Sequence, residues 1–110
     1  MANTFTRKLQ RDIGSSPEQI GAYTVGASTS TVVIGLTVTN TTGSAITANV
    51  FLNNGVANTY VIANAPIGSG ASLVVVGGDQ KIVLITGDSM WAESSAATSI
   101  DAVMIIMEIT

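Results

Sequence analysis

The 110-residue sequence predicts an all-β protein that folds as a single β-sandwich with a jelly-roll-like arrangement. Apolar residues alternate with small polar ones over several short segments, as in strands that have one buried face. Clusters of Gly, Asn, Asp and Ser separate these segments at nearly regular intervals, which is typical of turns. Hydrophobic residues make up 46% of the chain and charged residues only 10%. This composition favours a packed core and excludes a disordered, highly charged chain.

Residues 1–19 predict an extended N-terminal arm that precedes a β-sandwich domain of residues 20–110. Phe5, Leu9 and Ile13 recur every four residues, a spacing that would place them on one face of a short helix. The Gly-Ser-Ser-Pro sequence that follows would end such a helix. About two turns of helix are marginal in isolation. The arm is therefore either a frayed terminus or a segment that a partner orders.

About eight strands are expected in the rest of the chain. Asn-Thr-Thr-Gly-Ser at 40–44 predicts a turn between two strands that form an antiparallel hairpin. Gly-Gly-Asp-Gln at 77–80 predicts a second hairpin in the same way. In chain order, the expected strands cover residues 22–26, 31–39, 46–52, 60–62, 73–76, 81–85, 90–92 and 102–109.

Several of these strands are apolar on both faces. In the last strand Val103 and Ile105 alternate with Met104 and Ile106, and Phe51 lies between two apolar neighbours. A sheet this small cannot bury both faces within one chain, so we expect a second subunit or another protein to cover the surplus. The alternative is that loops or the N-terminal arm fold over it. The predicted interface residues are Phe5, Arg7, Lys8, Leu9, Arg11, Ile13, Phe51, Val74, Val76, Met104 and Ile106.

Charge is unevenly distributed along the chain, whose formal net charge is −3. Arg7, Lys8 and Arg11 are three of the four basic residues, whereas six of the seven acidic residues follow residue 12. A cationic arm on an acidic body predicts docking on an acidic neighbour, including another copy of the chain. We expect no nucleic-acid binding, because three cations make a weak phosphate contact and the acidic body would repel DNA.

The composition lacks the residues of most familiar catalytic and metal sites, so we expect neither an enzyme nor a cofactor. The chain contains no Cys and no His, which excludes disulfides, thiolate zinc sites and histidine bases. Asp79 and Lys81 could form an acid–base pair, but no third group is available to orient a nucleophile, so a tight turn is favoured. Asp79, Asp88 and Asp101 could ligate Ca²⁺, but they lie in separate turns and lack the spacing of a dedicated site.

The few aromatic residues allow a second functional class. Trp91 is interpreted as a core or interface anchor. Phe51, Tyr23 and Tyr60 could stack on a sugar or a base, although five aromatic residues predict no continuous platform. A carbohydrate-binding or adhesin-like sandwich with Trp91 and Tyr60 on its ligand surface remains the alternative.

Neither a membrane span nor a secretory signal is expected. No apolar run approaches the ~20 residues that a transmembrane helix needs. The first twelve residues lack the apolar region of a secretory signal.

Four segments carry a resemblance to small virion structural proteins of tailed bacteriophages, including marine and cyanobacterial ones. They are VVIGLTVTNTT, NAPIGSGASLVVVGGDQK, LITGDSM and the closing MEIT, and the resemblance covers most of residues 31–110. It implies a non-enzymatic, multi-copy component of a phage particle that is made in the host cytoplasm and incorporated into the virion.

Two locations are compatible with this resemblance. One is a capsid decoration or cement protein, typically trimeric, whose arm reaches across shell subunits. The other is a ring-forming component of the neck, tail or baseplate. The implied partners are further copies of the chain and other virion proteins, such as the major capsid protein or neck and tail proteins. We expect a homo-oligomer, as a trimer or a ring, at micromolar concentration.

Overall fold

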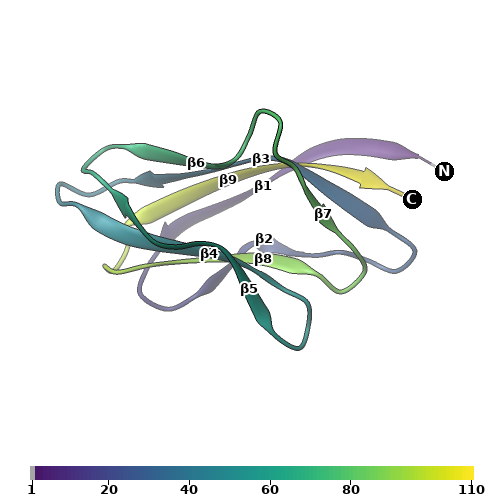
Figure 1. Ribbon diagram of the computed structural model, residues 1–110, viewed down its shortest axis with the longest axis horizontal. Coiled ribbons are helices and arrows are strands. Elements are labelled where there is room, and N and C mark those ends of the chain that lie inside the picture. The colour runs from purple at the N-terminus through teal and green to yellow at the C-terminus, as the bar shows by residue number, and fades with distance from the viewer. Residues whose placement is uncertain (1) are drawn as a thin grey trace.

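A computed structural model describes residues 2–110 and confirms the predicted β-sandwich, with nine strands in two antiparallel sheets (Figure 1). No helix in the described part of the chain is long and apolar enough to cross a membrane. The strands are β1 (Asn3–Ile13), β2 (Glu18–Thr24), β3 (Ser30–Asn40), β4 (Ile46–Asn53), β5 (Asn58–Ile67), β6 (Ser72–Val76), β7 (Ile82–Leu84), β8 (Ser89–Ser94) and β9 (Ile100–Ile109).

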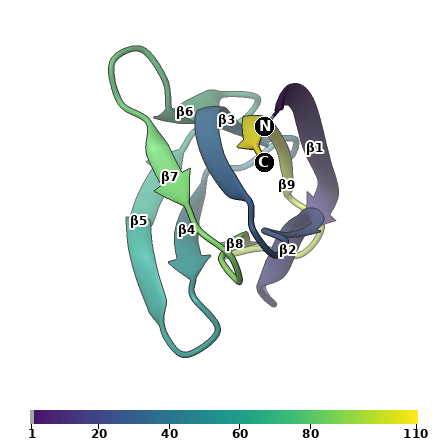
Figure 2. The ribbon, with the colours of Figure 1, turned by 90° about the vertical axis from the view of Figure 1, so that its right-hand side faces the viewer.

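The strand order of the two sheets is that of a jelly roll. The first sheet has the order β1-β9-β3-β6, with β7 also paired to β3, and the second sheet has the order β2-β8-β4-β5. The chain crosses repeatedly from one sheet to the other, so neighbours in a sheet are often distant in sequence. The end-on view of Figure 2 shows the two layers, with β1 and β5 on opposite sides of the molecule.

Both predicted hairpins are wrong. β3 and β4 belong to different sheets, and the turn between them carries the chain across the core. β6 and β7 both pair antiparallel with β3, so they lie one after the other along it rather than against each other. Gly78 has a positive φ of 61° in the connecting loop, and the Lys81 ammonium donates to its carbonyl. Turn residues predict where the chain bends. They do not predict which strand the next segment pairs with.

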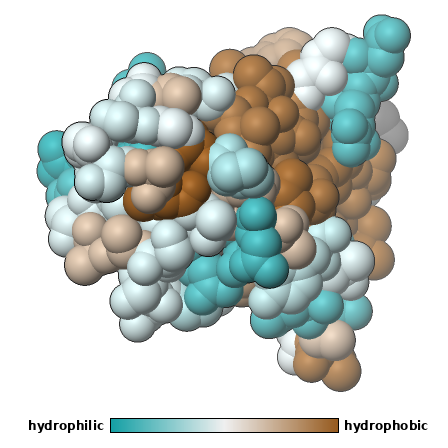
Figure 3. Space-filling view, turned by 60° about the vertical axis from the view of Figure 1, so that its left-hand side comes forward, coloured by the Kyte–Doolittle hydropathy of each residue, from teal (hydrophilic) through white to brown (hydrophobic). Residues whose placement is uncertain are grey.

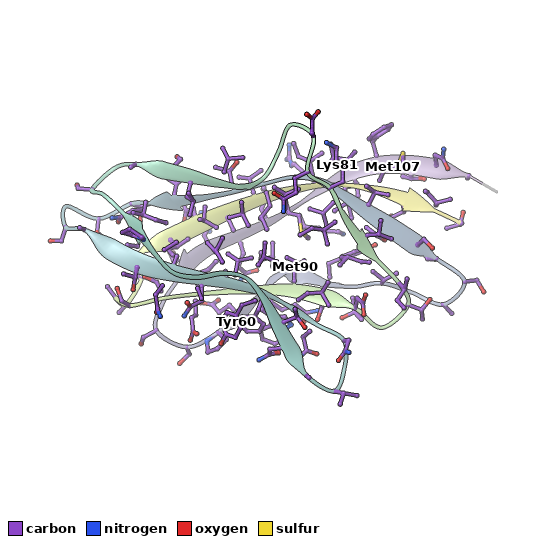
Figure 4. The ribbon with its side chains drawn as sticks, in the orientation of Figure 1. Tyr60, Lys81, Met90 and Met107 are labelled. Carbon is purple, nitrogen blue, oxygen red and sulfur yellow. The ribbon has the colours of Figure 1, made fainter. Side chains whose placement is uncertain are left out.

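The core lies between the sheets and depends on bulges that reverse the alternation of side chains. In β3 the pairing with β9 shifts between Val33 and Gly35. Val33 points inward before this shift, and Leu36 and Val38 point inward after it. Regular alternation would place Val32 and Val38 on one face, and the bulge interrupts that alternation. Figure 4 shows the core side chains between the layers, with Met90 among them.

The N-terminal segment is extended, so Phe5, Leu9 and Ile13 do not form one face of a helix. Residues 3–13 form β1, which pairs along β9 and makes one edge of the first sheet. Neighbouring side chains of β1 therefore point to opposite faces, with a period of two instead of 3.6. Pairing with the apolar strand β9 supplies the hydrogen bonds and contacts that an isolated two-turn helix lacks.

β1 is also held against β2 by a close approach at Gly21. This glycine has a φ of +64°, and a Cβ placed there would lie 2.5 Å from the Cβ of Lys8. At the end of β1 the pairing shifts between Gln10 and Ile13, and Asp12 has a φ of 57°. The shift turns Ile13 into the core, where it is fully buried.

Candidate functional surfaces

The outer face of the first sheet is apolar. Of the nine large hydrophobic side chains that are exposed in residues 2–110, seven lie on or beside this face. In the space-filling view, hydrophobic residues gather along the upper and right-hand part of the molecule (Figure 3). The seven residues are Phe5, Leu9, Val74, Val83, Ile85, Val103 and Ile105.

Strand register joins these side chains into two rows that run across the sheet. In one row Phe5, Met107, Val32 and Val83 stand opposite one another on β1, β9, β3 and β7. The side chains of such cross-strand neighbours are in contact distance.

The second row runs in the same way through Leu9, Val103, Thr37 and Val74 on β1, β9, β3 and β6. Between the two rows Ile105 lies over Gly35, with its Cδ1 atom 3.9 Å from the position that a Cβ would take there. The result is a largely apolar face four strands wide, in which Thr37 is the polar member of the second row.

Five of the residues predicted for an interface are instead buried within the subunit. Met104 and Ile106 are fully buried, because β9 turns Val103 and Ile105 outward. A register shift between Leu36 and Thr37 places Val76 inward, opposite Leu36. The other two are Ile13, in the core, and Phe51, covered on the second sheet.

The three N-terminal cations do not form one patch. Arg7 stands opposite Ile105 of β9 in the strand register and lies on the outer face of the first sheet, where it is exposed. Lys8 lies on the opposite face of β1, with its Nζ atom 4.9 Å from the centre of the Tyr23 ring. This cation–π contact is internal to the subunit. Arg11 is exposed beyond the regular pairing of β1.

On the outer face of the second sheet, three aromatic rings form a row. Phe51 stands opposite Tyr60 of β5 on one side and opposite Trp91 of β8 on the other. The ring centres of Phe51 and Tyr60 are 5.2 Å apart, and the Phe51 and Trp91 rings are nearly parallel at 6.4 Å. Figure 4 shows Tyr60 on the lower side of the sandwich, away from Met107. The three rings are therefore neighbours on this sheet, although Phe51, in the middle of the row, is almost fully buried.

A hollow of about 230 Å³ adjoins this row. Its walls are the rings of Trp91, Phe51 and Pro17 together with the side chains of Asn53 and Asn58. The Nδ2 atom of Asn53 donates to Oδ1 of Asn58 at 2.6 Å, which links the amides across the β4–β5 turn. The indole Nε1 of Trp91 donates to Oγ of Ser89 and holds the ring in place. None of the lining side chains is charged.

The acidic residues weighed as a calcium site serve the fold separately. Oδ2 of Asp88 accepts a hydrogen bond from the backbone N–H of Ile85, and Oδ1 of Asp101 accepts one from that of Asp12. Asp79 is exposed in the β6–β7 loop. Among residues 2–110 no three acidic side chains come together in a way that could hold a metal ion.

Similar folds occur in solved structures, although no protein-family model and no curated protein sequence matches the chain. A chain of a Bacillus endospore appendage, one of a family of disulfide-linked pili, has a TM-score of 0.57 and 14% identity over 99% of this chain and 87% of its own. A chain of infectious bursal disease virus, Gx strain, has a TM-score of 0.55 and 13% identity over 99% of this chain and 33% of its own. The nucleoplasmin-like N-terminal domain of Drosophila FKBP39 has a TM-score of 0.50 and 13% identity over 98% of this chain and 92% of its own.

These likenesses establish the fold. Two of the three neighbours are parts of larger assemblies, a pilus and a virus particle. At 13–14% identity, the fold is what the chain shares with them.

Proposed function

We propose that this chain is a non-enzymatic structural protein of a bacteriophage particle that assembles through the outer face of the first sheet. The observation that carries the proposal is the pair of apolar rows on that face, with Val74 at 65% and Phe5 at 69% exposure. Covering each such side chain with a partner stabilises the complex by on the order of 1 kcal/mol. A continuous apolar face of this kind marks a protein interface.

The partner on this face is a second copy of the chain. A face four strands wide and about eight residues long covers on the order of 500 Å². Two copies face to face would then bury about 1,000 Å², which is the threshold area of a biological interface. An apolar surface is complementary to itself, and most oligomers are built from identical chains.

Within the particle we assign the chain to the outside of the shell, as a decoration or cement protein. One broad face of the sandwich is apolar, whereas the strands of the other carry exposed Asn and Thr residues such as Asn58 and Thr59. In a face-to-face pair the apolar faces cover each other and the polar faces point to solvent, as suits a protein on the outside of a particle. Arg11, which is exposed near the end of the edge strand β1, would contact acidic groups of a neighbouring shell protein. A ring in the neck, tail or baseplate is the alternative, and its copies would need a second contact surface besides this face, because a face-to-face contact closes as a pair.

The oligomeric state of the purified protein tests the interface. Light scattering at micromolar concentration should give a mass that is a multiple of 11.2 kDa. Ile105→Lys, at the centre of the face, should reduce the mass to that of one chain, because a buried unpaired ammonium is strongly disfavoured. Val56→Lys is the matched control, because Val56 is 92% exposed in the β4–β5 turn, away from this face. A wild-type monomer would contradict the proposal.

The copy number in purified virions distinguishes the two locations. Quantitative mass spectrometry should find hundreds of copies per particle for a shell decoration protein and about a dozen for a ring of cyclic symmetry. Absence of the chain from purified particles would exclude both.

A further inference from the structure

The aromatic row and the adjoining hollow have no part in the assembly through the first sheet. They lie on the opposite broad face, formed by β8, β4 and β5. Three of the five aromatic residues of the chain gather there, next to a hollow of about 230 Å³. We propose that this hollow binds one neutral sugar ring of a glycan.

The size of the hollow selects a small ligand. Sites for drug-sized molecules measure about 300–1,000 Å³, so a hollow of about 230 Å³ accommodates one six-membered ring and not a longer chain. The rest of a glycan would extend into solvent, past Tyr60, which is half exposed beside Phe51.

The chemistry of the walls matches the two sides of a sugar ring. A pyranose has an apolar face of C–H groups and a rim of hydroxyls. Trp91, Phe51 and Pro17 supply apolar walls for the C–H face. Asn53 and Asn58 supply amide groups at the rim, and an amide can both donate to and accept from a hydroxyl.

The absence of charge in the lining selects against ionic ligands. A sialic acid, a phosphate or a nucleotide would enter the hollow without a cation to compensate its charge, which is costly. A neutral hexose or N-acetylhexosamine has no such cost. The site is also rigid, because Trp91 is held by its hydrogen bond to Ser89 and by the parallel ring of Phe51.

Trp91 is the only tryptophan of the chain and therefore reports binding directly. We would titrate the full-length protein with the methyl glycosides of glucose, galactose, mannose and N-acetylglucosamine while recording its intrinsic fluorescence. At least one of them should change the emission with a Kd on the order of 1 mM, as expected for a ligand of this size. A blue shift is expected, since the ring displaces water from the indole.

Substitutions locate the site. Asn58→Ala should weaken binding at least tenfold while leaving Trp91 in place as the reporter. Asn3→Ala is the matched control, because Asn3 is an exposed asparagine on the other sheet. This variant should bind the sugar as tightly as the wild type does. Thermal unfolding of both variants, followed by circular dichroism, checks that the sandwich is intact.

Three results would overturn the proposal. One is the absence of any fluorescence response to all four glycosides together with no binding on an array of neutral glycans. Another is equal binding by the Asn58→Ala and Asn3→Ala proteins, which would place the sugar elsewhere. The third is a response to adenosine or to a short peptide that exceeds the response to every glycoside. The oligomer test uses Ile105, on the opposite face, so either proposal can fail without the other.

Discussion

The phenol of Tyr23 on β2 donates a hydrogen bond of 2.9 Å to the carboxylate of Glu108 on β9, and this contact joins the two sheets. The hydroxyl of Thr31 on β3 lies 2.7 Å from the same phenol oxygen. Because the phenol donates to Glu108, Thr31 is the donor in the second bond. The Nζ atom of Lys8, on β1, lies 4.9 Å from the centre of the Tyr23 ring. Four strands thus meet at one nearly buried side chain.

Replacing Tyr23 by Phe should lower the free energy of unfolding by about 1–3 kcal/mol. The variant leaves the fully buried hydroxyl of Thr31 without its partner and removes a donor from Glu108. Urea unfolding followed by circular dichroism measures the change. Tyr60→Phe is the control, since Tyr60 is half exposed, and its effect should stay within about 0.5 kcal/mol.

The same group predicts a loss of stability in alkaline solution. Burial raises the pKa of Tyr23 above its usual value of 10.0, and the charge and hydrogen bond of Glu108 raise it further, against the opposing effect of the Thr31 hydrogen bond. The folded protein therefore holds this proton more tightly than the unfolded chain does. Its contribution to stability is fully present below about pH 10 and is lost as the pH rises through the folded pKa.

The pH dependence can be isolated by subtraction. Unfolding free energies of the wild type and of Tyr23→Phe, measured from about pH 8 to about pH 11, should differ by a constant amount at first and then converge. A difference that widens with pH would mean that the pKa of Tyr23 is lowered, not raised.

Ile13 and Leu9 provide a matched pair on β1. Ile13 is fully buried, whereas Leu9 is 49% exposed on the outer face of the first sheet. Ile13→Ala should cost about 2–4 kcal/mol of unfolding free energy, because it leaves a cavity in the core. Leu9→Ala should cost less than about 1 kcal/mol in the dissociated chain. Similar losses for both, measured by urea unfolding, would indicate that β1 is not packed as the structure has it.

Asn40, at the end of β3, should be one of the least replaceable polar residues. It is fully buried, its Nδ2 atom donates to the carbonyls of Ser44 and Ile67, and its Oδ1 atom accepts from the backbone N–H of Thr42. Asn40→Ala should lower the free energy of unfolding by about 3 kcal/mol, because several buried groups lose their partners at once. Thermal and urea unfolding measure the effect. Asn3→Ala, which removes an exposed amide, is the control.

Period-two patterns located most strands, but two features depended on tertiary packing. The four-residue spacing of Phe5, Leu9 and Ile13 is compatible with one helical face or with alternate positions along a strand. Only pairing with β9 decides between them. Similarly, the residues of the turn before β4 predict a bend but not a change of sheet. The sheet that β4 joins depends on strands that are distant in sequence.

Aromatic clustering was also beyond the reach of sequence patterns. Phe51, Tyr60 and Trp91 are separated by up to 40 positions, and they meet because β4 lies between β5 and β8. Their spacing along the chain carries no signal of this. Asn53 and Asn58 flank a short turn, so their proximity could have been expected, but not that of the Trp91 ring.

Residue order alone established a chain of short strands whose apolar content exceeds what one core can take. It misassigns the two sides of β9, because it predicts Met104 and Ile106 at an interface, whereas the packing of the first sheet on the second buries both in the core. The physical reason is that alternation defines two faces without ranking them when both are apolar. Bulges in β3 and β6 then exchange the faces partway along a strand, and their positions follow from pairing between segments far apart in the chain.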